Sequence, residues 1–377
     1  KLPLYKTFLI KNNFQLPYPL MNVINGGAHA NNGLQIQEFM IRPDRANNFS
    51  EAIRICFVVI KNLRTLIKNK GLSIAVGDEG GFAPMISSNN QALDMIVSAI
   101  KKSGFKNGKD VSICLDIAAN ELYKDGKYSI HSKKYLSVEE TIQQYKKMID
   151  KYKIKSIEDP FAENDWNSWN KLMKETKNIQ IVGDDLYVTN LERLKKGFLN
   201  ISSNAILIKL NQIGTVSETL DVIKFAQTIG FKTVISHRSG DSEDHFISDL
   251  AVGTNSNQIK AGSLARSERV AKYNQLLRIE EDLGNKAKIA KGKPSAIPKP
   301  VIPTVNFVAT ILNSIPSRAT VLTSPPNVPA NKVPKIGPVQ ENETMAKVSA
   351  MKNIPINPPM FDPESALLPH LLGKANS

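Results

Sequence analysis

Six predicted β-strands each end at or beside an ionisable residue. The strands are VSICLD, IKSIED, IQIVGD, AILIKL, TVISHR and NQIKAG, and they carry Asp116, Glu158, Asp184, Lys209, the pair His237 and Arg238, and Lys260. In a β/α barrel the carboxyl ends of the strands meet at one mouth, where active sites are built. One charge after a strand ordinarily starts a loop, but six in succession would gather unpaired charge unless a ligand binds there.

Three of these residues are carboxylates on neighbouring predicted strands. Asp116, Glu158 and Asp184 offer hard oxygen ligands, no His accompanies them, and the nearest cysteine, Cys114, is set in an apolar run, so zinc is not favoured. Such a set suits Mg²⁺, which takes octahedral oxygen coordination. A salt bridge explains each carboxylate alone equally well, whereas the trio favours a metal. Lys209 and Lys260 would face the same mouth, one as a base with a lowered pKa and the other as an anion-binding group.

Two further segments are rich in glycine and in polar side chains. They are VGDEGGFAP at 76–84, with Asp78 and Glu79, and NGGAHANNGLQIQEF at 25–39, with His29, Gln37 and Glu38. An ordinary β-turn and a Gly-rich connection are the alternatives that need no function. Neither segment is a phosphate-binding loop or a dinucleotide fingerprint, and the chain has no GxSxG motif, so nucleotide-binding and hydrolase functions are disfavoured.

The elements that must position these residues follow an α/β pattern. Over residues 1 to about 290, short β-branched runs alternate with amphipathic stretches of helical period, which predicts βα units in a parallel sheet or barrel. Three pairs with capping-box spacing predict helix starts: Ser137 and Glu140, Thr189 and Glu192, and Thr215 and Glu218. Four glycines predict helix ends: Gly104, Gly197, Gly230 and Gly284.

Composition limits the class of protein. The chain has 377 residues, 41% of them hydrophobic and 22% charged, which is enough apolar content for a sizeable core. No apolar run approaches the roughly 18 residues of a membrane span. Two cysteines cannot form a disulfide framework, so a reducing compartment, the cytoplasm, is expected. The net charge of +14 comes from scattered lysines on predicted helix faces, so we expect no nucleic-acid partner but a preference for anionic ligands.

The last part of the chain differs from the rest. Fifteen of the 21 prolines follow residue 291, among repeated Asn, Ser and Lys. Proline removes backbone donors and fixes φ, so this segment is not expected to sustain helices or central strands. The sequence therefore predicts two parts, an α/β domain over residues 1–291 and a Pro-rich disordered tail over residues 292–377.

The motifs together resemble the enolase family. They are NGGAHANN, IQEF, VGDEGGFAP, SIEDPF, GDDLYVTN, ILIKLNQIGT, SHRSGDSED, AVGT, QIKAGS and RSERVAKYNQLLRIEE, in the family's order and spacing over about residues 2–290. The resemblance implies a TIM-like (β/α)8 barrel with an antiparallel second strand, followed by two helices and six βα units. It also implies a Mg²⁺-dependent lyase that converts 2-phosphoglycerate to phosphoenolpyruvate in glycolysis and its reverse.

The resemblance also implies a role for each matching residue. Asp116, Glu158 and Asp184 would bind the first Mg²⁺, Lys209 would be the general base, and Glu79 would be the general acid, oriented by Glu38 and Gln37. His29 would close over the substrate, Arg238 and Ser239 would bind its phosphate beside His237, and Lys260 would contact its carboxylate. The family binds two Mg²⁺ ions and is usually homodimeric.

One departure from the family pattern is expected to matter. The sequence shows no counterpart of the family's N-terminal domain, whose serine-containing loop helps to bind the second Mg²⁺ and which contributes to the dimer interface. The second metal site and the dimer are therefore expected to be incomplete. The alternative function is a catalytically impaired fragment that acts as a binding or surface protein, as other enolases do with plasminogen. The resemblance also allows a secreted or cell-surface location in addition to the cytoplasm.

Overall fold

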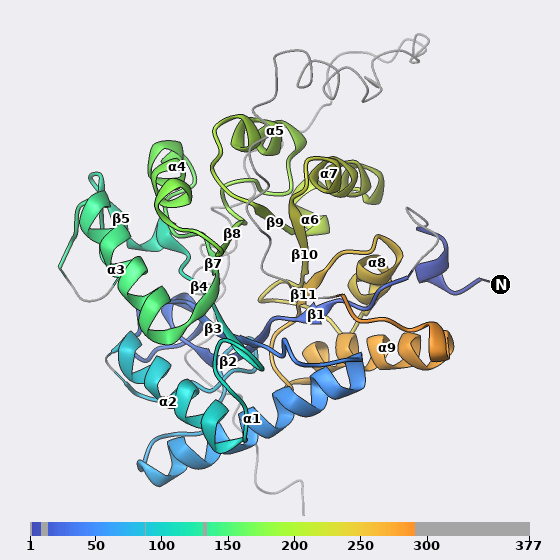
Figure 1. The fold of residues 1–377 in the computed structure, drawn as a ribbon, viewed down its shortest axis with the longest axis horizontal. Helices are drawn as coiled ribbons and strands as arrows, with labels where there is room; N and C mark the ends of the chain where they lie inside the picture. Colours follow the sequence, from blue (N-terminus) through green and yellow to red (C-terminus); the bar gives the residue numbers. More distant parts are fainter. Residues whose placement is uncertain (1, 9–13, 87, 131–133, 291–377) are drawn as a thin grey trace, which may run out of the picture. The chain divides into compact units, whose positions relative to one another are not determined.

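The computed structural model describes residues 2–8, 14–86, 88–130 and 134–290 (Figure 1). The tail predicted over residues 292–377 lies outside the described residues, so its boundary and its disorder stay predictions.

Nine strands of the described residues form one sheet. Their order in the sheet is β1 (Tyr18–Pro19), β11 (Gln258–Lys260), β10 (Lys232–Ser236), β9 (Ala205–Ile208), β8 (Gln180–Gly183), β7 (Ile154–Glu158), β4 (Ser112–Asp116), β3 (Glu38–Arg42) and β2 (Met21–Asn25). Only Leu20 separates β1 from β2, so these two pieces continue one strand that pairs with β11 at one end and with β3 at the other. The sheet therefore closes into a barrel with eight strand positions.

The direction of the strands confirms the predicted fold. β3 runs antiparallel to both β2 and β4, whereas all the pairs from β4 through β7, β8, β9, β10 and β11 to β1 are parallel. The strand at the second position is thus the antiparallel one. A short separate hairpin, β5 (Tyr123–Lys124) with β6 (Lys127–Tyr128), lies in the connection that follows β4.

The helices surround the strands (Figure 1). They are α1 (Phe49–Asn69), α2 (Asn89–Lys102), α3 (Val138–Tyr152), α4 (Trp166–Glu175), α5 (Leu191–Leu199), α6 (Leu210–Ile213), α7 (Val216–Thr228), α8 (Phe246–Gly253) and α9 (Ser267–Leu283). Two helices, α1 and α2, separate β3 from β4, and the later strands are each followed by helix. The long helices bury an apolar face, as Ala92, Ile96 and Ala99 of α2 show.

Small and medium apolar side chains fill the interior of the barrel. The buried cluster is Leu20, Met40, Cys114, Val182, Ala205, Leu207 and Val234, drawn from six different strand positions. Both cysteines are free and buried, and burial raises the pKa of the Cys114 thiol to about 12. The thiols are therefore packing groups and take no part in disulfide bonding within the described residues.

Most of the predicted helix ends are confirmed. Ser137 and Glu140 form a reciprocal capping box at the start of α3, and the Thr215 side chain accepts a bond from Glu218 at the start of α7. Gly104, Gly230 and Gly284 follow or end α2, α7 and α9.

Two predictions at α5 were wrong. The N-cap is Asn190, one residue later than Thr189, because its side chain accepts the hydrogen bond from the Arg193 N–H. Thr189 instead contacts Gln212 and the backbone of Lys209. Gly197 lies inside α5 rather than after it, because a Cβ there would come within 2.3 Å of the Tyr187 ring. Close packing, not helix termination, explains this glycine.

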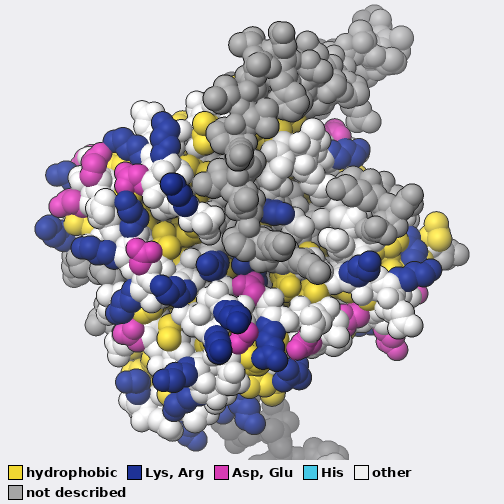
Figure 2. Space-filling view, in the orientation of Figure 1, with side chains coloured by type: hydrophobic (Ala, Val, Ile, Leu, Met, Phe, Trp, Pro, Cys, Tyr) yellow, Lys and Arg dark blue, Asp and Glu magenta, His cyan; other side chains and the backbone are white. Residues whose placement is uncertain are grey.

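The basic residues are scattered over the surface, as the sequence predicts. Figure 2 shows Lys and Arg side chains spread over one face, with Asp and Glu side chains between them. Among the described helices, none combines the length and the apolar character that crossing a membrane requires.

Candidate active site

Strand register brings three carboxylates into one row. Glu38 lies opposite Asp116 across β3 and β4, and Asp116 lies opposite Glu158 across β4 and β7. All three side chains are at least 97% buried, and each stands at the same end of the barrel. Asp184 follows β8 directly, at the next position around the mouth. The strand ends therefore bring Glu38, Asp116 and Glu158 into one row, with Asp184 at the next strand end. Among the described residues, the groups whose ligand atoms all lie within 4.8 Å of one another are His29, Glu38 and Glu79, and Asp159, Asp184 and Asp185, so a shared ion at Asp116, Glu158 and Asp184 stays a prediction.

Lys260 lies at the centre of this row. Its Nζ is 2.7 Å from Glu158 Oε1, 2.8 Å from Asp116 Oδ2 and 3.0 Å from Glu38 Oε1. Burial opposes the charged form of the lysine, but the nearby carboxylates outweigh it and hold the pKa of Lys260 well above its usual value. The predicted anion-binding lysine thus serves as a counterion of the carboxylates.

Lys209 pairs with the remaining carboxylate. Its Nζ donates to Asp184 Oδ2, and Gln212 donates to Asp184 Oδ1 at 3.2 Å. Burial would lower the pKa of Lys209, but the charge of Asp184 raises it above its usual value. A lysine in this state is protonated, so a base role requires another cation to take over Asp184.

The donor set fits a hard divalent cation. Glu158 Oε2 is buried and has no hydrogen-bond partner among the described residues, so one carboxylate oxygen still lacks a cation or donor. Burial and the charges of Asp116 and Asp184 raise the pKa of Glu158 well above its usual value, although Lys260 opposes this. The two lysines therefore leave part of the negative charge uncompensated. Carboxylate oxygens without sulfur or imidazole are the ligands that Mg²⁺ prefers.

The backbone of Asp184 is held by a residue that the sequence analysis did not single out. Asp159 accepts the N–H groups of Asp184 and Asp185 at 2.9 and 2.8 Å, and oxygens of all three carboxylates lie within 4.8 Å of one another. Burial and the neighbouring charges of Asp185 and Asp184 raise the pKa of Asp159 well above its usual value. Its position directly after Glu158, in the sequence EDP, was the available signal.

A second group of polar side chains lies beside the row. Asn22, fully buried on β2, donates to Glu38 Oε2 at 3.1 Å and to Glu79 Oε2 at 3.2 Å. His29 Nδ1 lies 3.9 Å from an oxygen of each of the two glutamates. Sequence reasoning missed Asn22 because a single Asn in the apolar run LMNVI gives no signal of its own. The predicted trio of His29, Glu38 and Glu79 is nevertheless brought together.

The two glutamates differ in protonation. Burial and the charge of Glu79 raise the pKa of Glu38 well above its usual value. Burial acts the same way on Glu79, but His237, His29 and Lys260 outweigh it and hold the pKa of Glu79 well below its usual value. Of the two neighbouring carboxyl groups, Glu38 therefore favours the protonated form and Glu79 the ionised form.

Exposed donors lie at the rim next to the buried groups. Arg238 and Ser239 follow β10 and are exposed, and Arg238 Nη1 donates to Asn211 Oδ1 at 2.9 Å. His237, by contrast, is buried, and its Nε2 lies 3.3 Å from Glu79 Oε1. This rim offers one exposed guanidinium and a hydroxyl to an anion.

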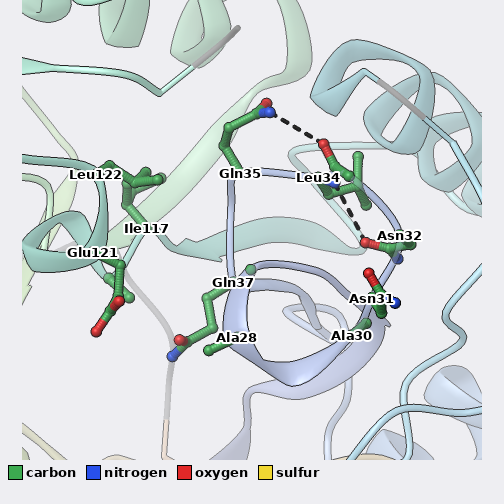
Figure 3. A pocket seen from close by; sticks show the side chains of 13 residues that line it. Ala28, Ala30, Asn31, Asn32, Leu34, Gln35, Gln37, Ile117, Glu121 and Leu122 are labelled. Atoms are coloured by element: carbon green, nitrogen blue, oxygen red, sulfur yellow. Dashed lines mark hydrogen bonds between the residues drawn. The ribbon is translucent and has the colours of Figure 1, made fainter. Parts of the chain in front are cut away.

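Gln37 lies apart from Glu79. Successive residues of a strand point to opposite faces, so Gln37 turns away from the side that Glu38 faces. It lines a pocket of about 390 Å³ between the segments 27–37 and 117–122, where Figure 3 shows its side chain beside Ala28. Among the described residues no contact joins Gln37 to Glu79, and its expected orienting role stays a prediction.

Comparison with known proteins agrees with this geometry. Residues 13–297 match the family described as "Enolase, C-terminal TIM barrel domain". The chain is also similar to a protein of Pelagibacter ubique (strain HTCC1062) named "Enolase", with 81% identity over 289 residues, which are 77% of this chain and 69% of that protein. The matched region includes every strand end described above. The chain therefore belongs to the enolase family.

Proposed function

We propose that the protein is a phosphopyruvate hydratase, a Mg²⁺-dependent lyase of glycolysis that converts 2-phosphoglycerate into phosphoenolpyruvate and water. The observation that carries the proposal is the separation of two proton-transfer groups across one charged mouth. Lys209 follows β9, whereas Glu79 lies on the loop after α1 and reaches the mouth beside β2. An elimination needs a base on one side of the substrate and an acid on the other.

The buried carboxylates would hold the metal. Asp116, Glu158 and Asp184 are the residues proposed to bind Mg²⁺, which when bound would stabilise the charge that develops on the substrate carboxylate. Lys209, which is hydrogen-bonded to Asp184, would act as the base in its neutral form. Lys260, which lies among the carboxylates, would bind the substrate carboxylate.

The protein's own groups would then perform two proton transfers. Neutral Lys209 Nζ takes the proton from the carbon that bears the phosphate, and the electron pair forms the new double bond. The bond between the neighbouring carbon and its hydroxyl breaks, and Glu79 donates the proton that releases the hydroxyl as water. Glu79 needs a proton before it can act as the acid, and we propose Glu38, whose pKa is raised beside it, as the source of that proton.

The rim groups would bind the phosphate. Arg238 offers a planar donor fork and Ser239 a hydroxyl, and both are exposed beside the mouth. His29, on the short segment Gly27–His29, would approach the substrate from the opposite side. The binding or surface function is not favoured by the described contacts, and the incompleteness of the second Mg²⁺ site and of the dimer stays a prediction. The cytoplasm is the proposed location because glycolytic chemistry occurs there.

A coupled assay tests the reaction. The full chain, 2-phosphoglycerate and Mg²⁺ should yield phosphoenolpyruvate, and a chelator should abolish the yield. A surface-binding protein without turnover would give none under either condition.

A second experiment tests the two roles separately. Lys209→Ala should abolish exchange of the substrate α-proton with solvent, because the base is gone. Glu79→Gln should stop dehydration but keep the exchange, because only the acid is gone. Equal loss of exchange in both variants would contradict the assignment.

A further inference from the structure

Helix α9 carries two buried cations on one face. Arg269 and Lys272 are three residues apart, which places them side by side on the helix, and they are 0% and 1% exposed. A buried cation is expensive unless it is fully hydrogen-bonded, so both residues should have specific partners.

The partners of Arg269 are parts of two distant loops. Nη1 donates to Arg238 O at 2.6 Å, and Nη2 donates to Asp78 O at 3.2 Å and to Ser239 O. The first loop carries Glu79 and the second carries the rim donors Arg238 and Ser239. One guanidinium thus joins the loop of the proposed general acid to the loop of the proposed phosphate-binding groups.

Arg269 also contacts the ring of His237. Its Nη1 meets His237 Nδ1, and the other ring nitrogen, Nε2, is the one that lies 3.3 Å from Glu79 Oε1. A guanidinium can only donate hydrogen bonds and stays protonated in proteins, so Nδ1 must act as the acceptor. A neutral imidazole with a bare Nδ1 carries its proton on Nε2, where it faces the Glu79 carboxylate.

The surrounding charges agree with a neutral ring. Burial lowers the pKa of His237, the charges of Arg269 and Lys260 act in the same direction, and Glu79 opposes them. A second proton on Nδ1 would point directly at the guanidinium. The guanidinium therefore fixes the tautomer from the Nδ1 side, while Nε2 lies 3.3 Å from Glu79 Oε1 without an aligned hydrogen bond.

The packing around Arg269 leaves it little freedom. A Cβ on Gly262 would lie 2.7 Å from both Arg269 Cδ and Glu79 O, and Gly262 has a φ of +75°. Ser263 N–H donates to Glu79 O at 2.9 Å. The Arg269 side chain therefore passes Gly262 at a place where any larger residue would collide with it.

Lys272 offers a comparison within the same helix. Its Nζ donates to Glu268 O at 2.7 Å and to Ser242 O, and it lies 3.5 Å from Asp241 Oδ2. It thus supports the outer part of the loop that follows β10, without a described contact to His237. Loss of Lys272 should loosen the loop but leave the tautomer unchanged.

We propose that Arg269 is a positioning residue of the dehydration step, which fixes His237 as the Nε2–H tautomer and so directs that proton at Glu79. The inference rests on the proposed role of Glu79 as the general acid. The inference adds that Arg269, a residue of α9, determines which hydrogen-bond donor faces the proposed acid. Arg269 itself contacts neither the substrate nor the metal ligands.

The first test measures the tautomer of His237 in the wild-type protein. The chain has five histidines, so ¹⁵N-histidine labelling gives a small number of ring signals, and His237→Gln identifies those of His237. At neutral pH we expect a bare Nδ1 and a protonated Nε2. A proton on Nδ1 would overturn the proposal, whether or not the protein turns over 2-phosphoglycerate.

Variants provide the second test. Arg269→Met should let Nδ1 take up a proton as the pH falls from 8 to 6, and Lys272→Met should not. If the proposed reaction is correct, Arg269→Met should lower kcat at least about a hundredfold, since a wrong histidine tautomer costs a catalytic triad more than that. The decrease in kcat of Arg269→Met should be larger at acidic pH than at alkaline pH.

Two controls separate this role from simple support of the fold. Arg278→Met removes an exposed arginine from the same helix and should change neither the ring signals nor kcat. Arg269→Lys keeps the charge and a single donor, so it should preserve the tautomer better than Arg269→Met. Identical ring signals in wild type and Arg269→Met, or the same change in Lys272→Met, would refute the assignment.

Discussion

Lys260 Nζ lies 2.7 Å from Glu158 Oε1 at the mouth of the barrel, and both side chains are at least 97% buried. The pair joins the ends of two strands that are separated in the sheet by β8, β9 and β10. The ammonium therefore stands among the same oxygens that are proposed to hold Mg²⁺. Binding of the metal must then compete with this ion pair, which makes the affinity of the site sensitive to each carboxylate.

Glu158→Gln should weaken Mg²⁺ binding at least about tenfold, because an amide replaces a charged oxygen ligand without changing the shape of the side chain. Isothermal titration calorimetry with Mg²⁺ measures this. Glu139→Gln makes the same chemical change at an exposed position on α3 and should leave the affinity unchanged. Equal affinities in wild type and Glu158→Gln would contradict the proposed ligand set.

Asn22→Asp should lower the rate of dehydration by about a hundredfold while leaving α-proton exchange largely intact. The change replaces the amide that donates to Glu38 and Glu79 with a third carboxylate, so the acid side of the site loses its donor. The base Lys209 is not among the contacts of Asn22. Parallel measurement of exchange and product formation checks the split, with the exposed Asn167→Asp on α4 as the control. A uniform loss of both steps would argue against a specific effect on the acid.

Asp185→Asn should stabilise the metal-free protein at pH 7.5. Burial and the charge of Asp184 raise the pKa of Asp185 to about 6, above the roughly 3.9 of an unfolded aspartate. A carboxyl with a raised folded pKa favours folding when it is protonated, and this contribution is lost as the pH rises through about 6.

The neutral amide removes that loss, so the free energy of unfolding should rise by up to about 3 kcal/mol at pH 7.5 and by roughly half as much at pH 5. Urea unfolding in the presence of a chelator measures the difference. Asp150→Asn, at an exposed position on α3, should show no such dependence on pH. A larger gain at pH 5 than at pH 7.5 would reverse the expected sign and refute the explanation.

Gly197→Ala should lower the free energy of unfolding by about 1–3 kcal/mol, although alanine ordinarily stabilises a helix. The new Cβ would meet the buried Tyr187 ring, whose hydroxyl is tied to Ser203 Oγ at 2.7 Å. Gly240→Ala is the control, because a Cβ there meets nothing within 4 Å. Thermal or urea unfolding that finds Gly197→Ala as stable as wild type would mean that Tyr187 can move aside.

The barrel and the strand ends could be predicted because both follow from local patterns. A buried apolar run that ends in Asp116 or Glu158 shows its own boundary, and the carboxyl ends of parallel strands have to meet. To place Glu38 opposite Asp116, one further fact was needed, the register between β3 and β4, which the structure supplies. The resemblance to the enolase family supplied the roles, which the pattern alone left open between a metal site and salt bridges.

The parts that could not be predicted depend on packing between distant segments. Asn22 and Arg269 give no local signal, because one lies in an apolar run and the other in a charged helix, and only the folded chain brings them to Glu79 and His237. Gly197 was misread for the same reason. A glycine required by a neighbouring ring has the same sequence appearance as one that ends a helix.

The pairing of Tyr18 with Gln258 bears on how the chain folds. These partners join the first strand piece to the last strand across 240 positions of sequence. Contacts of such long range slow folding, and no nascent chain on the ribosome can close the ring before β11 has been synthesised. Until then, β1 and β10 would be open edges able to pair with another chain, so rapid arrival of β11 should protect the protein from aggregation.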